Sequence, residues 1–255
     1  FYLCEKLQEV NIEENSEPLA IEKDTFSYSS IERIYLPSQI NKIGAYSFSN
    51  CKQLKKFEVA KNSKLKIIEK GAFYDSSIKS IDIPSSVVDL KAGWCLNTCY
   101  LNEIKIDPNN QFYKMHDNKF ILGKTTAENE TFNVLLFCNR YIKKVIIPFD
   151  VEIIESYSFE HCEIQTVEIP SNSKLHTIND RSFSLSSIER INIPASLIKI
   201  GNHAFNKCTN LKQVEIPQNS QLQIIDDFAF YNSTIESISI PPHVKIISEF
   251  SFNSI

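Results

Sequence analysis

Seven cysteines and five histidines are the residues of this chain best suited to metal binding, disulfide formation or nucleophilic chemistry. No two cysteines form a Cys-x-x-Cys pair, and no cysteine and histidine spacing fits a zinc site. None of the histidines recurs beside a serine or cysteine with an acid at a matching position, so nucleophilic catalysis has no signature. We therefore expect a protein without enzymatic activity, metal or cofactor.

Oxygen ligands gather once, at Asp107, Asn109, Asp117 and Asn118. Their order does not follow the alternating ligands of a calcium loop, and Asp and Asn are also common turn residues, so we expect them to form turns. The triplets that begin at Asn129 and Asn232 match the acceptor sequence for N-glycosylation, which matters if the protein is secreted.

Composition excludes several functional classes. The chain has 27 Lys and Arg against 31 Asp and Glu, a net charge of −4, which gives no general attraction to nucleic acid. No apolar run is long enough to insert into a membrane. Only five glycines occur, which argues against glycine-rich phosphate loops. The 255 residues predict either two domains or an elongated repeat array.

An internal repeat runs along the whole chain and decides between these alternatives. The motif Ile/Leu-x-x-Ile/Val-x-Ile/Leu recurs every 22 to 24 residues, with one interval of 41 residues. Residues 29–84 align on 186–241 without a gap, and 29 of the 56 positions are identical. Most copies of the motif are followed by Pro. The longer repeats also carry a turn Asn, at Asn15, Asn62, Asn109, Asn172 and Asn219.

A unit of this length has too few apolar groups to form its own core, so neighbouring units must stack. The motif predicts a short parallel strand whose fourth and sixth residues point inward, and Pro then ends the pairing. The stack of about ten turns also aligns one aromatic position per turn. In one turn Cys95, with Trp94 beside it, occupies this position. The Phe residues at this position are Phe1, Phe26, Phe48, Phe73, Phe159, Phe183, Phe205, Phe230 and Phe252.

Four cysteines share another repeat position but never lie on adjacent turns, which places them beyond disulfide distance. We interpret Cys4, Cys51, Cys162 and Cys208 as small buried apolar groups. Pairing of Cys95 with Cys99, or of Cys138 with Cys162 on the next turn, stays open, and so does the redox compartment.

The combined repeat pattern resembles the leucine-rich repeats of the BspA-like (Treponema pallidum) class. Residues 188–211, from Ile-Glu-Arg-Ile-Asn-Ile-Pro to Ala-Phe-Asn-Lys-Cys-Thr-Asn-Leu, match that pattern nearly position by position. The resemblance implies a right-handed solenoid with a parallel sheet on one face and short strands or helical turns on the other. It also implies a role in adhesion, host-protein binding or microbial surface contact.

We expect one leucine-rich repeat domain over residues 1–255, with partial repeats at both ends, as in a segment of a longer array. The 41-residue interval inserts a segment within about 107–138. Two apolar runs around the polar stretch 124–131 predict a β-hairpin that stands off the coil. The alternative is an insertion whose aromatic residues pack on the coil, namely Phe112, Tyr113, Phe120 and Phe132.

The exposed positions of the long strands are the candidate binding residues, because solenoids commonly present a sheet face to partners. A solvated face of mixed charge is the alternative. The acidic side chains favour a basic patch on the partner and a contact that weakens with salt. The candidates are Arg33, Tyr35, Lys56, Glu58, Asp82, Lys105, Glu168, Arg190 and Glu215.

The sequence thus predicts a non-enzymatic protein-binding module, part of a cell-surface or secreted adhesin that contacts host cell-surface, extracellular-matrix or microbial proteins. It predicts no nucleic-acid partner and no membrane insertion within this segment. The alternative is an intracellular scaffold or effector that uses the same coil.

Overall fold

The computed structural model describes residues 1–14, 17, 19–126 and 128–253. They form a β-solenoid of about 10 turns with parallel sheets, as the repeat predicts. The chain divides into two compact units, Phe1–Met115 and His116–Ile255, called unit 1 and unit 2 below. Asn15, one of the expected turn residues, lies outside the described residues.

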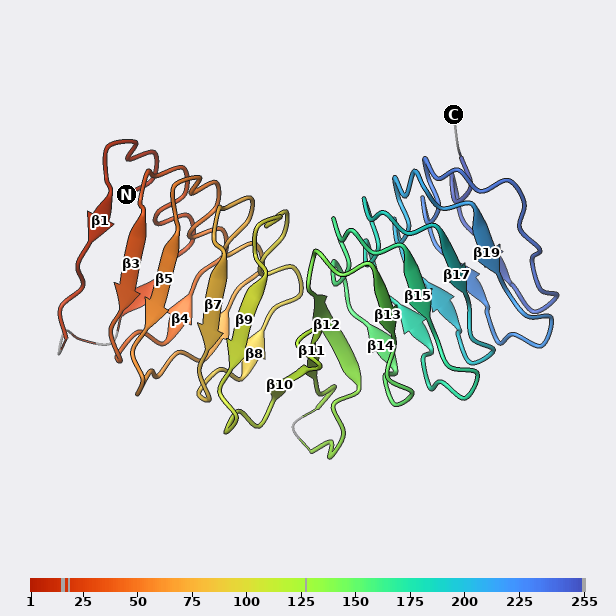
Figure 1. Ribbon diagram of the computed structural model, residues 1–255, viewed down its shortest axis with the longest axis horizontal. Coiled ribbons are helices and arrows are strands. Elements are labelled where there is room, and N and C mark those ends of the chain that lie inside the picture. Colours follow the sequence, from red (N-terminus) through yellow and green to blue (C-terminus); the bar gives the residue numbers. More distant parts are fainter. Residues whose placement is uncertain (15–16, 18, 127, 254–255) are drawn as a thin grey trace. The chain divides into compact units, whose positions relative to one another are not determined.

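In unit 1 each turn contributes one strand to a front sheet and a two-residue strand to a back sheet (Figure 1). The front sheet comes in two parallel pieces, of three and two strands. These are β1 (Glu9–Val10), β3 (Arg33–Leu36) and β5 (Lys56–Val59), then β7 (Ser80–Ile83) and β9 (Glu103–Ile106). The back sheet contains β2 (Ala20–Ile21), β4 (Lys42–Ile43), β6 (Ile67–Ile68) and β8 (Asp89–Leu90). The division between the two units falls within β10 (Tyr113–His116).

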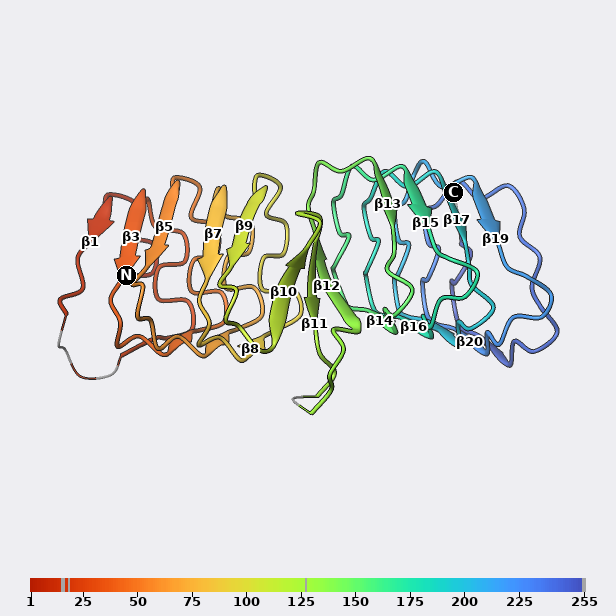
Figure 2. The same cartoon turned by 60° about the horizontal axis from the view of Figure 1, so that its bottom comes forward.

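Unit 2 repeats this arrangement (Figure 2). Its front sheet contains β13 (Lys144–Ile146), β15 (Thr166–Glu168), β17 (Arg190–Asn192) and β19 (Gln213–Glu215). Its back sheet runs through β14 (Ile153–Ile154), β16 (Thr177–Ile178), β18 (Lys199–Ile200), β20 (Ile224–Ile225) and β21 (Ile246–Ile247). The back strands are therefore short strands rather than helical turns.

Side chains alternate along the front strands as the motif predicts. In β3, Ile34 and Leu36 are buried, whereas Arg33 and Tyr35 are exposed. The strand ends before Pro37, which has no amide hydrogen to donate to a neighbouring strand. The sequence pattern therefore determines both the length of the strand and the face that it buries.

The predicted aromatic column exists in both units. In unit 1 the rings of Phe26, Phe48 and Phe73 stack with centroids 5.2 and 5.5 Å apart. In unit 2 the column is Phe159, Phe183, Phe205, Phe230 and Phe252, with centroids 4.5 to 5.2 Å apart. Contact between successive rings adds to the stabilisation from burial alone. The column holds each turn in register with the next.

Cys95 takes the column position on its turn, as expected. The amide of Phe73 donates to the carbonyl of Trp94, just as the amide of Phe48 donates to that of Ala72. The Trp94 ring then meets Phe73 edge-on, with centroids 6.0 Å apart and planes at 88°. The Trp94 indole thus packs against Phe73, where the side chain of Cys95 is too small to replace a Phe ring.

Hydrogen bonds between turns also line the third side of the coil, where the Phe column lies. The amides of Asp24, Phe26 and Tyr28 donate to Ala45, Ser47 and Ser49 of the next turn. The residues two before and two after the Phe adopt left-handed backbone conformations, with φ of 57° at Asp24 and 59° at Tyr28. Their side chains point away from the interior, so the core does not restrict what they are.

The insertion forms the predicted hairpin, but the expectation that it stands off the coil is wrong. β11 (Phe120–Gly123) pairs antiparallel with β12 (Val134–Cys138), and β12 pairs parallel with β14. Phe120 and Leu135 are buried in the core of unit 2, and Phe132 packs against that core. Because both faces of the hairpin carry apolar side chains, it is stable only as part of the solenoid. The alternative of a packed insertion describes it better.

We predict that Phe73→Ala lowers the free energy of unfolding by about 3–5 kcal/mol, because it removes a fully buried ring and leaves a cavity. Phe73 also contacts Phe57 edge-on at 4.9 Å, so its loss affects the strand as well as the column. Urea denaturation measures the change. Tyr100→Ala, at an exposed aromatic residue of the same unit, is the control and should change stability by less than about 0.5 kcal/mol. Equal stability of the two variants would contradict the column.

Candidate binding surfaces

In unit 1 all six candidate binding residues are exposed on the front sheet. Arg33 lies beside Lys56 and Tyr35 beside Glu58 in the β3–β5 pair. Asp82 lies beside Lys105 in the β7–β9 pair. These residues share the outward positions of alternating strands, as the sequence predicts. Whether they bind a partner stays a prediction.

Ion pairs cover much of this face. The Arg33 guanidinium contacts the Glu9 carboxylate on the neighbouring strand at 2.9 Å. Within single strands, Lys56 pairs with Glu58 at 3.0 Å and Lys105 with Glu103 at 3.1 Å. The Glu103 carboxylate raises the pKa of Lys105 by accepting a hydrogen bond from its ammonium group. Positive and negative side chains therefore alternate on this face, and a partner must present charges of both signs at matching positions.

A hollow of about 600 Å³ lies where β5, β7 and β9 end. Asp82 and Lys105 line it together with Lys61 and Asp107. Ile83 and Ile106 also line it, so the hollow combines charged and apolar residues. Protein-binding patches commonly combine both kinds of residue.

The unit 2 candidates lie together in a hollow of about 590 Å³ on its front sheet. Glu168, Arg190 and Glu215 line it, and Asn192 pairs with Glu215 in the β17–β19 ladder. Lys144 reaches across from β13 to Glu168, with 2.6 Å between nitrogen and oxygen. The sequence predicts that these residues share one face, and the structure shows that they also line the same hollow.

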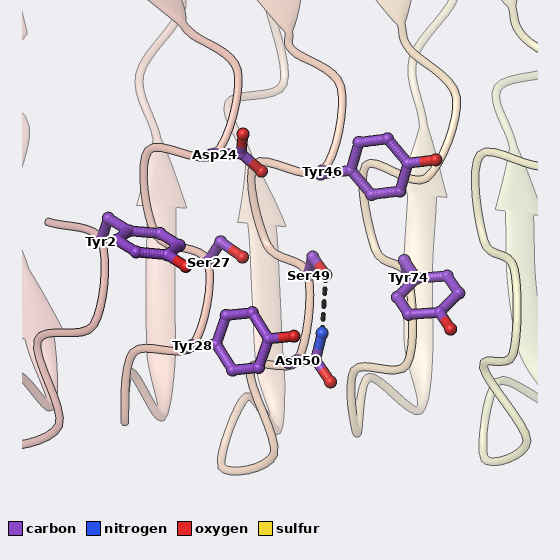
Figure 3. Close-up of a pocket in the computed structure, with 8 residues that line it drawn as sticks. All are labelled: Tyr2, Asp24, Ser27, Tyr28, Tyr46, Ser49, Asn50 and Tyr74. Atoms are coloured by element: carbon purple, nitrogen blue, oxygen red, sulfur yellow. Dashed lines mark hydrogen bonds between the residues drawn. The ribbon is translucent and has the colours of Figure 1, made fainter.

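A third surface, a tyrosine groove on the turns of unit 1, was missed by the sequence analysis. It has a volume of about 470 Å³ and is lined by Tyr2, Asp24, Ser27, Tyr28, Tyr46, Ser49, Asn50 and Tyr74. Figure 3 shows Tyr2 and Tyr28 on one side and Tyr46 and Tyr74 on the other, with the small polar residues between them. The available signal was the recurrence of tyrosine within two residues of the column Phe on four turns.

Gly71 positions one ring of this groove. A Cβ atom at Gly71 would lie only 2.5 Å from the Tyr46 Cε1 atom, so the ring lies directly against the glycine backbone. Gly71 also has a left-handed conformation, with φ of 67°. The close approach of the ring requires glycine here, whereas the left-handed backbone alone does not, since Phe228 adopts it at the corresponding position with φ of 55°.

All seven cysteines are free thiols, so neither pairing that the sequence left open is present. Cys51, Cys162 and Cys208 are buried, as the sequence interpretation expects, whereas Cys4 is half-buried. The Cys51 and Cys208 thiols donate to the carbonyls of Phe26 and Phe183, each at 3.0 Å.

Cys162 differs because a buried arginine lies beside it. Arg140 Nη1 donates to the Cys162 sulfur at 3.4 Å and to the carbonyl of Ser158 at 3.1 Å. The guanidinium also lies over the Phe137 ring, 4.5 Å from its centroid. The Cys138 thiol contacts Cys162 from the preceding turn. Nothing in the repeat pattern indicates that Arg140 is buried.

Cys138 and Arg140 together lower the pKa of this thiol. Burial raises the pKa of Cys162, but the hydrogen bond from Cys138 and the Arg140 charge outweigh burial and lower the pKa to about 7. Cys208 lies at the same repeat position, where Ser186 takes the place of Cys138 and Arg140 as the hydrogen-bond partner. Burial outweighs the lowering effect of Ser186 and raises the pKa of Cys208 to about 12. Of Cys162 and Cys208, Cys162 is therefore the thiol that ionises more readily.

We predict opposite pH dependences for Cys162→Ala and Cys208→Ala. Because the pKa of folded Cys162 lies below the ordinary value of 9.0, the stability advantage of the wild type over Cys162→Ala is lost as pH falls through 7. It grows as pH rises from 7 to 9. The advantage over Cys208→Ala stays constant below pH 9 and falls above it, because only the unfolded thiol ionises there. Urea denaturation at a series of pH values measures both, and parallel curves would contradict the role of Arg140.

The remaining sequence candidates lie as follows. Asn129 and Asn232, the two glycosylation acceptors, are half-buried, and Asn232 lines a shallow hollow on the turns of unit 2. In the part of the chain that the structure describes, no three His, Cys, Asp or Glu side chains converge as metal ligands. No described helix has the length and apolar character needed to cross a bilayer.

The parallel β-solenoid with short repeats places the chain among leucine-rich repeat proteins, and comparisons with known proteins identify the family. The model for the BspA type leucine rich repeat region matches residues 1–102 and 130–255 in 6 copies. The chain belongs to this BspA-type leucine-rich repeat family. A comparison with curated proteins finds no match.

Solved structures share the fold at low sequence identity. The pneumococcal vaccine antigen PcpA is 20% identical with a TM-score of 0.64, over 88% of this chain and 64% of the PcpA chain. A leucine-rich cell surface protein from Faecalibacterium prausnitzii is 20% identical with a TM-score of 0.54, over 85% of this chain and 74% of its own. A leucine-rich repeat protein from Eubacterium ventriosum is 19% identical with a TM-score of 0.53, over 88% and 82%.

Proposed function

We propose that this chain is a non-enzymatic protein-binding module of a cell-surface or secreted adhesin, which contacts host or microbial proteins through its front sheets. The observation that carries the proposal is the unit 2 hollow, where Glu168, Arg190 and Glu215 meet on one exposed sheet face. A rigid sheet holds these side chains in fixed positions, so little order is lost when a partner binds. The surface location draws support from the family and from the cell surface protein of the same fold.

The arrangement favours a partner with a basic patch beside apolar contacts. Ile146 is exposed on β13, directly beside Glu168 in the ladder, so an apolar contact lies next to an acidic one. Glu215 accepts a hydrogen bond from Gln213 at 2.5 Å, which fixes its carboxylate without neutralising it. Such rim charges steer association and determine specificity more than they add affinity.

We predict that Glu168→Lys with Glu215→Lys weakens binding of the purified chain by roughly tenfold at low salt, because it reverses both acidic charges. Binding is measured with fluorescent protein on matrix laid down by cultured mammalian cells and, separately, on intact microbial cells. Binding of the wild type should also fall as salt rises to about 0.3 M.

The matched control carries Glu130→Lys and Glu249→Lys, which change the net charge equally at exposed positions of unit 2 outside the front sheet. It should bind like the wild type. Equal weakening of both variants would show a general charge effect and would contradict the assignment to the front sheet. Binding to neither surface would contradict the adhesin proposal.

The seven free thiols favour a second candidate, an intracellular scaffold or effector that uses the same surface in a reducing compartment. An antibody against this segment distinguishes the two on intact cells of the source organism. Labelling without permeabilisation supports the adhesin. Labelling only after permeabilisation supports the intracellular scaffold.

A further inference from the structure

The tyrosine groove of unit 1 is separate from the front sheets and belongs to the turns on another side of the coil. We propose that it binds a neutral oligosaccharide. This goes beyond the proposed function, because it assigns a second ligand, of a different chemical class, to a different surface.

The residues that line the groove favour a ligand with flat apolar faces and hydroxyl edges. Four tyrosine rings provide aromatic surface, and the other four lining residues are Asp24, Ser27, Ser49 and Asn50. The described lining contains no Lys, Arg or His, so it lacks the cations that a phosphate or sulfate group needs. It also contains no aliphatic side chain, so it lacks the packing surface of an apolar peptide or lipid site. A sugar ring presents C–H faces for the aromatic rings and hydroxyls for the polar groups.

The tyrosines form two pairs that frame the groove (Figure 3). Tyr2 meets Tyr28 edge-on with centroids 6.1 Å apart, and Tyr46 meets Tyr74 in the same manner, also at 6.1 Å. In an edge-on pair one ring supports the other and leaves its own face open. Gly71 supports Tyr46 from below, since the ring lies against its backbone. Each side of the groove therefore offers an aromatic platform that is held in place before a ligand arrives.

Polar atoms between the pairs are placed to receive sugar hydroxyls. Asn50 Nδ2 donates to Ser49 Oγ at 2.9 Å, which fixes the amide and leaves its oxygen as an acceptor. The Asp24 carboxylate makes a long contact with Lys23, at 4.0 Å, and is 43% exposed. A carboxylate can accept two hydrogen bonds at once, which suits neighbouring hydroxyls on one sugar ring.

Unit 2 shows that the fold does not require these side chains. At an offset of 157 residues the backbone is the same, with φ of 59° at both Tyr28 and Leu185 and of 56° and 55° at Tyr46 and His203. The groove residues Asp24 and Asn50 correspond in the same way to Arg181 and Lys207. Tyr74 corresponds to Tyr231, so one of the four groove tyrosines has a tyrosine as its counterpart in unit 2. The fold therefore does not require Asp24, Tyr28 or Tyr46 at these positions.

The correspondence supplies substitutions that the same backbone already accepts. We expect Tyr28→Leu with Tyr46→His to fold like the wild type and to weaken oligosaccharide binding by roughly tenfold or more, because one side of the groove loses a ring and the other exchanges its phenol for a smaller imidazole. The probes are hexasaccharides of β-1,4-glucose, α-1,4-glucose, mannose and N-acetylglucosamine, with a sulfated heparin hexasaccharide for comparison. Isothermal titration calorimetry and saturation-transfer NMR measure binding to the full chain.

The control variant carries Tyr35→Asn and Tyr100→Leu. It removes two exposed tyrosines outside the groove, and the first change introduces the residue found at Asn192. It should bind the hexasaccharides like the wild type. Asp24→Asn, an isosteric change at a half-buried position, should also weaken binding, and it tests the groove if the double variant loses stability.

Binding of at least one neutral hexasaccharide, weakened by the groove variants and not by the control, supports the proposal. No binding of any neutral hexasaccharide by the wild type overturns it. Undiminished binding by the groove variants, or tighter binding of the sulfated sugar than of every neutral one, also overturns it. None of these results depends on the front sheet, so the adhesin proposal is tested independently.

Discussion

Contact between successive turns is the interaction on which each unit depends. A turn of 22 to 24 residues cannot enclose a core, so its apolar side chains become buried only when the next turn covers them. Three sets of hydrogen bonds join the turns: the front-sheet ladders, the two-residue back ladders and the row of amides around the Phe column. The stacked rings of Phe183 and Phe205, 5.0 Å apart, show the same close fit in the interior. Any change in repeat length must therefore be accommodated without opening the stack.

The insertion shows how such a change is accommodated. Unit 2 begins with the hairpin, whose second strand, β12, takes the place that a back strand occupies in a regular turn, and it pairs with β14 in parallel. Cys138 occupies the column position, since its amide donates to Ser158 just as that of Phe159 donates to Ser182. Phe120 from the first hairpin strand fills the neighbouring space and meets Phe159 edge-on at 6.2 Å. The hairpin thus supplies a back-strand pairing and a core aromatic contact at the start of unit 2.

Local and periodic features were predictable from the sequence because they repeat. The inward residues Ile34 and Leu36, the column and the burial of Cys51 follow from spacing alone. The role of the hairpin was not predictable, because an apolar run does not reveal whether its partner is a neighbouring strand or a strand of the next turn. The buried position of Arg140 was not predictable, because its partners Ser158 and Cys162 lie on another turn. The tyrosine groove was not predictable, because the motif leaves the orientation of its backbone positions open. The repeat pattern predicted which residues face outward on the front sheets. It did not predict their ion pairs, because these depend on how neighbouring strands align.

The left-handed residues beside the Phe column have a consequence for how such proteins diversify. Tyr28, Leu185 and His203 show that very different side chains occupy these places on the same backbone, because the peptide hydrogen bond to the following turn imposes the conformation. Duplication of a repeat copies the buried side chains, which must stay constant, together with two outward positions, which are free to vary. Selection can thus change the surface chemistry of one turn at a time without altering the residues that determine the fold.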